Sequence, residues 1–187
     1  MEAFTDGVIA ILITVMVLEL KDGDGTSWHA LHTILPTVLT YVLSFVYLGI
    51  YWNNHHHMLQ ATERVTGMVL WANLHLLFWL SLVPATTSWM GRNHFAEVPV
   101  AVYGIVLLAA AIAYFILQTL IIRAQGDDST LARAVGRDWK GKLSPVLYVS
   151  AIVLAFLDRW LAVALFVVVA AIWFIPDRRV EHLLTTR

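Results

Sequence analysis

Long apolar stretches, each bounded by charged or turn-forming residues, restrict the fold of this chain more than any other feature of its sequence. The first covers residues 4–20, and as a helix its seventeen residues rise ~25 Å, close to the thickness of a bilayer's hydrocarbon core. Five more follow, over residues 33–57, 67–90, 99–122, 143–157 and 160–175. The pattern predicts an all-α membrane protein with six transmembrane helices per subunit, in a single domain over residues 1–187.

The composition agrees with a protein embedded in a membrane. Charged residues make up 13% of the chain and hydrophobic residues 59%, whereas soluble domains carry about 25% charged residues. The net charge of −1 gives no reason to expect nucleic acid as a partner. The absence of cysteine excludes disulfides and thiolate metal sites.

Basic residues in the loops predict the orientation, because cytoplasmic loops carry the excess of lysine and arginine. If the N-terminus is inside, nine basic residues lie on the cytoplasmic side: Arg64, Arg123, Arg133, Arg137, Lys140, Lys142, Arg178, Arg179 and Arg187. Three lie outside: Lys21, Arg92 and Arg159. This distribution predicts that both termini are cytoplasmic.

Two prolines predict local features of the helices. Pro36 is expected in the first turn of the second stretch, where a missing N–H costs little. Pro84 lies late in the third stretch and predicts a kink there.

The first apolar stretch carries one stripe of side chains that suits the lining of a pore. At about 100° per residue, the stripe contains Ile11, Thr14, Val15 and Leu18, with Gly7 near the same line. Branched apolar side chains with a single hydroxyl could face lipid, another helix or a pore, and we favour the pore. The alternative is an ordinary packing seam between helices, because Ile, Val and Leu are common in such seams.

Several polar residues fall at one depth near the inner ends of the first three stretches. Such groups are costly in a membrane unless they find partners in the protein interior. We therefore predict a buried network in which Asp6 accepts hydrogen bonds from some members of this set: Trp52, Asn54, His57, Asn73 and His75. The network could serve only to tie three helices together. It could also act as a proton-responsive latch, since histidine titrates near neutrality.

Three consecutive histidines, His55 to His57, raise the question of a metal site. Successive helical residues point ~100° apart, so the three cannot converge on one ion. One of them paired with His75 between two helices remains the alternative, as a metal or haem ligand set. The sequence contains no recognisable catalytic or nucleotide-binding motif. We expect no metal, no cofactor and no enzymatic activity.

Two segments resemble a known channel family. Phe-Thr-Asp-Gly-Val-Ile-Ala-Ile at residues 4–11 resembles the opening Phe-Ser-Asp helix of the bacterial relatives of the lysosomal potassium channel, transmembrane protein 175. Trp-Asn-Asn-His-His at residues 52–56, and Asn73-Leu74 with Pro84, are similar to the second and third helices of that family.

The resemblance implies a homotetramer of six-helix subunits in which the first helix of each subunit lines a central pore. By position, it makes Ile11 the narrow hydrophobic ring, Val15 and Leu18 further apolar layers, and Thr14 the hydroxyl layer linked to potassium preference. The sequence has no Thr-Val-Gly-Tyr-Gly carbonyl filter, so selectivity has to come from constriction, dewetting and a few hydroxyls.

The sequence departs from the family pattern at two points. Thr5 stands where the family has serine, which keeps the hydroxyl. The family's arginine four residues before Phe4 has no counterpart, because the sequence begins at Met1. If that arginine is truly missing, Asp6 loses a charge partner.

These observations lead us to expect a potassium-permeable cation channel, embedded in the lipid bilayer as a multi-pass protein of the bacterial inner membrane, with Ile11 and Leu18 as its hydrophobic gate. The main alternative is a proton-coupled transporter or proton-conducting protein that uses Asp6 and His75. A membrane redox or metal protein is the third possibility.

Overall fold

The computed structural model describes residues 1–20, 26–126, 129, 131–132 and 139–174. In chain order the helices are α1 (Glu2–Leu18), α2 (Trp28–Gln60), α3 (Gly67–Ser81), α4 (Val83–Arg92), α5 (Glu97–Gln125), α7 (Trp139–Leu154) and α8 (Arg159–Phe174). Only Leu82 separates α3 from α4, and the two run as one rod over Gly67–Arg92. The described part of the chain therefore forms six helical rods without strands, which confirms the all-α, six-helix prediction.

Polar side chains fix where several rods begin. The hydroxyl of Ser27 accepts a hydrogen bond from a backbone N–H three residues ahead at the start of α2 (3.3 Å). Thr66 does the same at the start of α3 (3.4 Å), and the Asp158 carboxylate accepts from the first turn of α8 (2.9 Å). These contacts pair N–H groups that a helix leaves free at its N-terminus.

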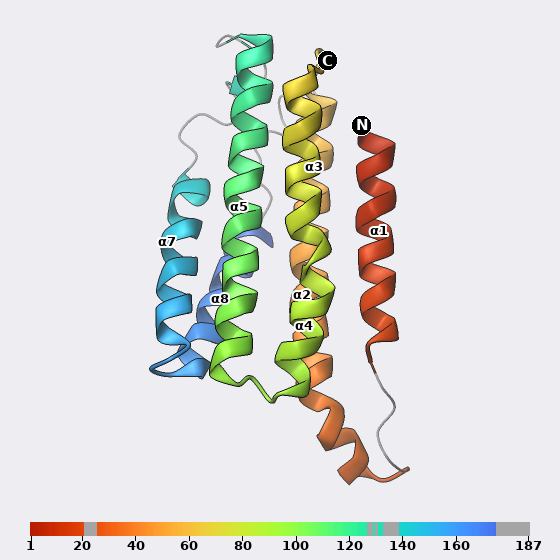
Figure 1. Cartoon of the computed structure of the whole chain (residues 1–187), viewed down its shortest axis with the longest axis vertical. Helices are drawn as coiled ribbons and strands as arrows, with labels where there is room; N and C mark the ends of the chain where they lie inside the picture. Colours follow the sequence, from red (N-terminus) through yellow and green to blue (C-terminus); the bar gives the residue numbers. More distant parts are fainter. Residues whose placement is uncertain (21–25, 127–128, 130, 133–138, 175–187) are drawn as a thin grey trace.

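The two prolines have different effects. The helix is interrupted at Leu82, two residues before Pro84, as expected for a kink at this proline. Its ring lacks an N–H and conflicts with the carbonyl four residues earlier, which kinks or breaks a helix at that point. The prediction for Pro36 was wrong, because α2 begins earlier than expected and places this proline inside the helix. The first turns of α2, drawn in dark orange, bend away from the bundle (Figure 1).

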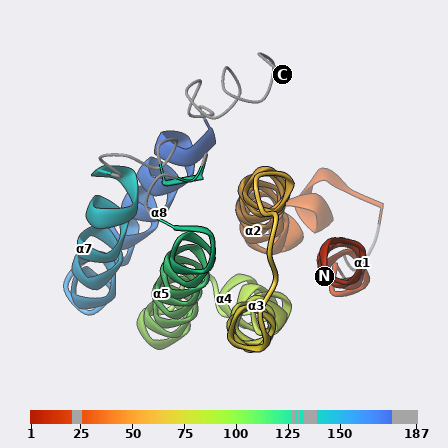
Figure 2. The ribbon, with the colours of Figure 1, turned by 90° about the horizontal axis from the view of Figure 1, so that it is seen from above.

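The rods run alternately up and down, so that α1 begins, α2 ends and α3 begins at the same end of the bundle, the upper end in Figure 1. α5 packs against α3, α4, α7 and α8. α1 lies at the edge of the bundle, beside α2 and α3 (Figure 2), and it also contacts α4. One side of α1 therefore has no neighbouring helix in the described part of the subunit.

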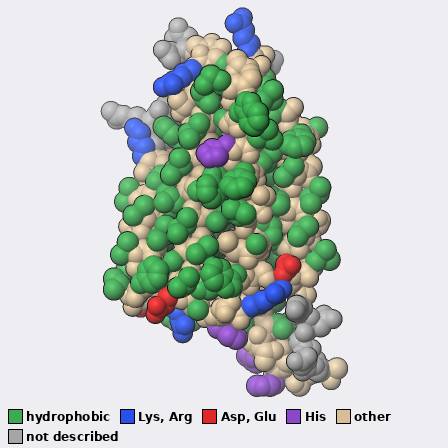
Figure 3. Space-filling model, in the orientation of Figure 1, with side chains coloured by type: hydrophobic (Ala, Val, Ile, Leu, Met, Phe, Trp, Pro, Cys, Tyr) green, Lys and Arg blue, Asp and Glu red, His purple; other side chains and the backbone are tan. Residues whose placement is uncertain are grey.

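Apolar side chains cover the outside of the bundle between its ends. Figure 3 shows hydrophobic side chains across the middle of one face, with lysine, arginine and acidic side chains towards the two ends. Three rods, Trp28–Gln60, Gly67–Arg92 and Glu97–Gln125, are long and apolar enough to cross a membrane, and Arg159–Phe174 is a shorter apolar helix. Soluble proteins rarely expose an apolar surface of this extent, so the exterior fits a lipid environment.

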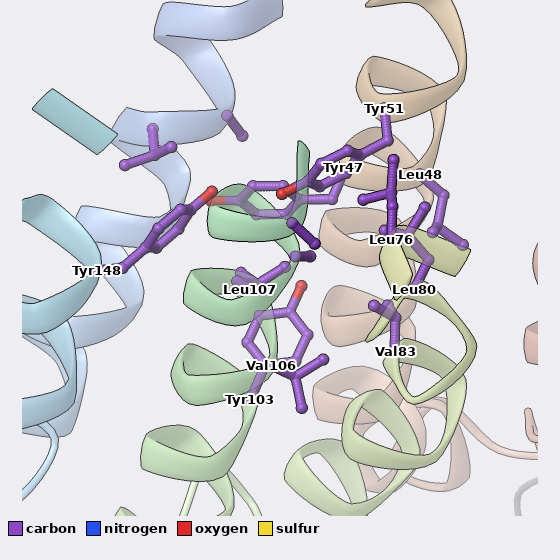
Figure 4. Close-up of a cluster of buried hydrophobic side chains, with 14 of the residues drawn as sticks. Tyr47, Leu48, Tyr51, Leu76, Leu80, Val83, Tyr103, Val106, Leu107 and Tyr148 are labelled. Atoms are coloured by element: carbon purple, nitrogen blue, oxygen red, sulfur yellow. The ribbon is translucent and has the colours of Figure 1, made fainter. Parts of the chain in front are cut away.

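The core joins α2, α3 and α5 through packed apolar side chains, among them Leu107, which is fully buried (Figure 4). A buried set of hydroxyls adds a polar link between helices. The Ser44 hydroxyl lies 2.6 Å from that of Thr87 and 3.0 Å from that of Tyr103. Because each hydroxyl can both donate and accept, this set connects α2, α4 and α5 without leaving polar atoms unpaired in the core.

Candidate functional site

α1 has two faces with opposite surroundings. The buried face, packed against neighbouring helices, consists of Thr5, Ile9, Leu12 and Met16. The other face carries the predicted stripe, in which Ile11 is 61% exposed, Leu18 is 81% exposed and Val15 is 40% exposed. At about 100° per residue, the centre of the buried set lies about 140° around the helix from the stripe. The stripe therefore lies on the face of α1 that its own subunit leaves uncovered.

Thr14 supplies the hydroxyl of this stripe. Its side chain is exposed, and its Oγ1 donates a hydrogen bond to the backbone carbonyl of Ile11 over 2.9 Å. This bond uses the hydroxyl proton, and a hydroxyl oxygen has two lone pairs besides. The oxygen of Thr14 therefore remains able to accept a hydrogen bond or to coordinate a cation.

A buried chain of hydrogen bonds joins α1, α2 and α3 near the upper end. Nε2 of His55 lies 2.7 Å from Oδ1 of Asn73, and Nδ2 of Asn73 donates to Oγ1 of Thr5 over 2.9 Å. None of the three residues is more than 2% exposed. An amide oxygen only accepts, so Nε2 of His55 carries the ring proton, while its Nδ1 has no partner among the described residues. This chain fixes the rotation of α1 against α2 and α3.

A second cluster, partly exposed, holds the first turns of α1 to α2. Nε1 of Trp52 donates to Oδ1 of Asp6 over 3.0 Å. Oε1 of Glu2 lies 3.0 Å from Nδ1 of His56. The rings of Trp52 and His56 stack with centroids 5.7 Å apart, so the two α2 residues that contact these carboxylates also support each other.

The structure divides the network expected around Asp6. Of the five expected donors, Trp52 is the one that bonds to Asp6 in the described part of the chain. The side-chain amide of Asn54 donates to the carbonyl of Ile50 instead (2.8 Å). Asn73, as described, bonds to Thr5 and lies in the buried chain.

The two expected histidines also lie outside that network. His75 is exposed on the surface of α3 and accepts a hydrogen bond from Trp79 over 3.0 Å, rather than facing the interior. His57 is partly buried, and its ring lies edge-on to His56 with centroids 5.9 Å apart. Both differ from the prediction because the rotation of a helix, which hydropathy does not reveal, decides which side its polar residues face.

The lower end of α1 has an anchor of its own. The carboxylate of Glu19, the residue after Leu18, accepts a hydrogen bond from the hydroxyl of Ser88 over 2.9 Å and forms an ion pair with Arg92. Both partners belong to α4. α1 is thus held by polar contacts at its two ends and by apolar packing between them.

Three side chains at the upper end come close enough together to suggest a cation site. The ligand atoms of Glu2, Asp6 and His56 lie within 4.8 Å of one another. However, Nε2 of His56 lies 2.9 Å from the amide nitrogen of Gln60, which can only donate, so Nε2 accepts and Nδ1 carries the ring proton. A protonated ring nitrogen cannot ligate a metal. The arrangement therefore favours a close electrostatic contact between His56 and Glu2, without hydrogen-bond geometry, over a metal site.

Similarity to known proteins decides the family. Residues 1–84 match the family model described as the endosomal/lysosomal potassium channel TMEM175. A relative from Chryseobacterium sp. (strain P1-3), described as a potassium channel, is 53% identical over 181 residues, which cover 97% of this chain and 94% of the relative. The chain belongs to the TMEM175 family. The resemblance noted in the sequence is thereby confirmed.

Other TMEM175 proteins show how far the similarity extends. The crystal structure of a lysosomal potassium-selective channel TMEM175 homolog from Chamaesiphon minutus matches with a TM-score of 0.83 at 28% identity, covering 94% of this chain and 95% of that one. The Danio rerio protein described as the endosomal/lysosomal proton channel TMEM175 is 26% identical over 126 residues, which cover 64% of this chain but 23% of that protein. The six-helix fold is therefore shared with a solved TMEM175 structure over nearly the whole chain.

The sequence analysis did not predict two members of the buried hydrogen-bond chain that holds α1, His55 and Thr5. A signal for His55 was present, because it continues a buried stripe of α2 at helical spacing: Ser44, Tyr47, Leu48, Tyr51, His55 and Met58. Thr5 similarly begins the buried stripe of α1. The TMEM175 family match, residues 1–84, includes both residues together with Asn73.

Proposed function

We propose that this TMEM175-family protein is a homotetrameric, potassium-permeable cation channel, a single six-helix channel domain with its pore lined by α1. The observation that carries the proposal is the uncovered stripe of Ile11, Thr14 and Leu18, opposite a face that is firmly packed. Three bacterial relatives are described as potassium channels, and the solved relative is described as potassium-selective.

One α1 helix cannot enclose a pore, so several copies have to turn their uncovered faces towards a common axis. Rotational symmetry then repeats each residue of the stripe as a ring. Ile11 forms the narrow hydrophobic ring, Val15 and Leu18 form further apolar layers, and Ile11 and Leu18 together act as the gate. Such rings control conduction by constriction and dewetting. Thr14 places hydroxyl oxygens between the apolar layers, where a partly dehydrated cation can contact them.

The orientation proposal places the upper end of the bundle in the cytoplasm and the protein in the bacterial inner membrane. Four basic residues occur at the described upper end: Arg64, Arg123, Lys140 and Lys142. Arg92 and Arg159 occur at the lower end. The remaining basic residues used in the orientation argument, Lys21 among them, lie outside the described residues. An excess of positive charge marks the cytoplasmic side.

The deciding experiment is a reversal potential measured with purified protein in planar bilayers, with potassium on one side and sodium on the other. We expect a current that reverses towards the potassium equilibrium potential. Ile11→Ala should raise the single-channel conductance, because it widens the narrowest ring. Val17→Ala is the matched control: Val17 is 46% exposed but lies off the stripe. Equal conductance of Ile11→Ala and wild type would reject Ile11 as the gate.

A proton-conducting protein or proton-coupled transporter is the second candidate, favoured by the carboxylates and histidines at the upper end of α1 and by vertebrate relatives described as proton channels. Its test is proton flux into potassium-free proteoliposomes, followed with a pH-sensitive dye. This candidate predicts flux that is lost in Asp6→Asn or His75→Gln. The channel proposal predicts that potassium current survives both substitutions.

A further inference from the structure

A recess lies among α2, α5, α7 and α8, on the side of α2 away from α1. It has about 550 Å³ of empty space counting its open mouth, and the centre of a water molecule can move through about 50 Å³ of that space. At about 10–15 Å³ per water on this measure, the recess has room for about four waters. This corresponds to a ligand of a single ring rather than one with several fused rings.

The walls of the recess are aromatic. Six aromatic side chains contribute: Tyr47, Tyr51, Tyr114, Phe115, Tyr148 and Trp173. Figure 4 shows Tyr47 and Tyr51 of α2 and Tyr148 of α7 extending towards one another across the space between these helices. The rings of Tyr51 and Tyr114 meet edge to face with centroids 6.2 Å apart. Flat faces and edges of this kind favour another aromatic ring over a flexible chain.

Most polar groups in these walls already have partners. Nε1 of Trp173 donates to the hydroxyl of Ser144 over 2.7 Å, and that hydroxyl donates to the carbonyl of Lys140 over 2.8 Å. The hydroxyl of Tyr47 donates to the carbonyl of Phe166 over 2.7 Å. These bonds hold the side chains in place, so the recess is preformed rather than a gap between loose side chains.

Tyr51 differs from these residues. It is 9% exposed and lines the recess, yet its hydroxyl has no hydrogen-bond partner in the part of the chain that the structure describes. The carboxamide of Gln118 lines the same space. The Tyr51 hydroxyl is not among the described buried atoms that lack a partner, so it borders the open space of the recess, where the hydroxyl or carbonyl oxygen of a ligand can pair with it. Ligand pockets commonly combine apolar walls with a few such polar groups.

We propose that this recess is a binding site for a small lipid-soluble molecule with one aromatic ring and one hydroxyl group, a phenol, whose oxygen pairs with Tyr51. The open rim, where Phe115 is 54% exposed, faces the apolar exterior of the subunit and lets such a molecule enter from the bilayer. The ring packs among the tyrosines, and an acyl chain in its place leaves the Tyr51 hydroxyl unpaired.

The test measures binding of 4-(trifluoromethyl)phenol to the full-length protein in lipid nanodiscs by ¹⁹F NMR, with empty nanodiscs subtracted. We expect a saturable component that trifluoromethylbenzene, which lacks the hydroxyl, binds at least fivefold more weakly. Tyr51→Phe should reduce that preference by about fivefold, the effect of one hydrogen bond. Because this substitution removes one oxygen atom, the fold is expected to persist.

A second variant tests the location. Ala111 lines the recess, and Ala111→Phe fills it, which should abolish the saturable component. Ala164→Phe is the matched control, since Ala164 is exposed on α8 away from the recess lining. Three outcomes overturn the proposal: no saturable binding above empty nanodiscs, equal binding by the Ala111 and Ala164 variants, or equal affinity of the two probes in the wild type. The measurement requires no ion flux, so it stands apart from the channel proposal.

Discussion

α1 and α5 are both apolar helices, yet the bundle uses them in opposite ways. α5 packs against four other helices and buries residues such as Tyr103, Leu107 and Leu117 completely. α1 lies at the edge, buries one narrow face and leaves Ile11 and Leu18 exposed. In a membrane protein the exterior is as apolar as the core. An apolar composition therefore does not show whether a helix lies in the centre of the bundle or at its edge. The uncovered face of α1 is the part of the chain that the proposed pore would turn towards other copies.

The two helices are also held differently. α5 is fixed mainly by apolar side chains on several sides. α1 relies on polar contacts at its ends: Asn73 with Thr5 at the upper end, and Ser88 and Arg92 with Glu19 at the lower end. Substitutions in α5 should therefore act on stability, and substitutions on the uncovered face of α1 should act on conduction.

The largest loss of stability is expected from a cavity in α5. Leu107→Ala removes a fully buried side chain and should lower the free energy of unfolding by about 2–5 kcal/mol. Unfolding in mixed micelles by detergent titration measures this effect. Ile105→Ala is the control, because Ile105 is 47% exposed on the same helix. Equal effects of the two substitutions would contradict the central position assigned to α5.

The next largest effect is expected at the buried hydrogen bonds that join His55, Asn73 and Thr5 and hold the upper end of α1. Asn73→Leu removes the acceptor of His55 and the donor to Thr5, leaving a buried ring N–H without a partner. The expected loss is about 1–3 kcal/mol in the free energy of unfolding. Asn53→Leu serves as the control, since Asn53 is partly exposed on α2. If the Asn73→Leu variant were as stable as the wild type, the hydrogen bonds among His55, Asn73 and Thr5 would not be what holds α1.

A smaller effect is expected at the partly exposed hydrogen bond between Trp52 and Asp6. Asp6→Ala removes the acceptor of Trp52 but leaves that indole within reach of water, so the loss should be about 1 kcal/mol or less. Thermal unfolding followed by circular dichroism can detect it when compared with Glu63→Ala, a substitution at an exposed carboxylate between α2 and α3. A loss of stability greater than that of Asn73→Leu would show that the Trp52–Asp6 contact stabilises α1 more than the buried hydrogen bonds of Asn73 do.

The smallest effect on stability is expected on the uncovered face of α1. Ile11→Ala should change the free energy of unfolding of the subunit by no more than about 0.5 kcal/mol, as for other exposed positions. Ile9→Ala on the opposite face should cost several times more, because Ile9 is 1% exposed. If the two substitutions destabilise the subunit equally, the distinction between the faces of α1 fails.

Much of the fold was predictable because hydropathy and helix-end residues are local signals. Both α7 and α8 begin and end within a few residues of the predicted stretches, and Pro84 breaks its helix as expected. Pro36 was misplaced because Ser27 caps α2 well before the apolar stretch begins. Capping residues determine where a helix begins independently of hydropathy. The apolar stretch alone therefore placed the start of α2 several residues too late.

The candidate site was predictable only in part. The stripe of Ile11 and Leu18 follows from helical periodicity, since every side chain in it lies on the same helix. The partners of Asp6 and Asn73 did not follow, because a hydrogen bond between helices depends on how far each helix is rotated about its axis. His55 faces inward and His75 faces outward, although hydropathy places both at similar depth.

The sequence by itself determined that this chain is a bundle of apolar helices, where most of those helices lie and which side chains of α1 share a stripe. These features depend on residues near one another in the chain. The tertiary structure decided that this stripe is the face its subunit leaves uncovered, that His55 rather than His57 or His75 joins the buried anchor, and that tyrosines from α2, α5 and α7 surround one recess. Each of these depends on the relative rotation of helices distant in sequence, which is set by the packing of the whole bundle.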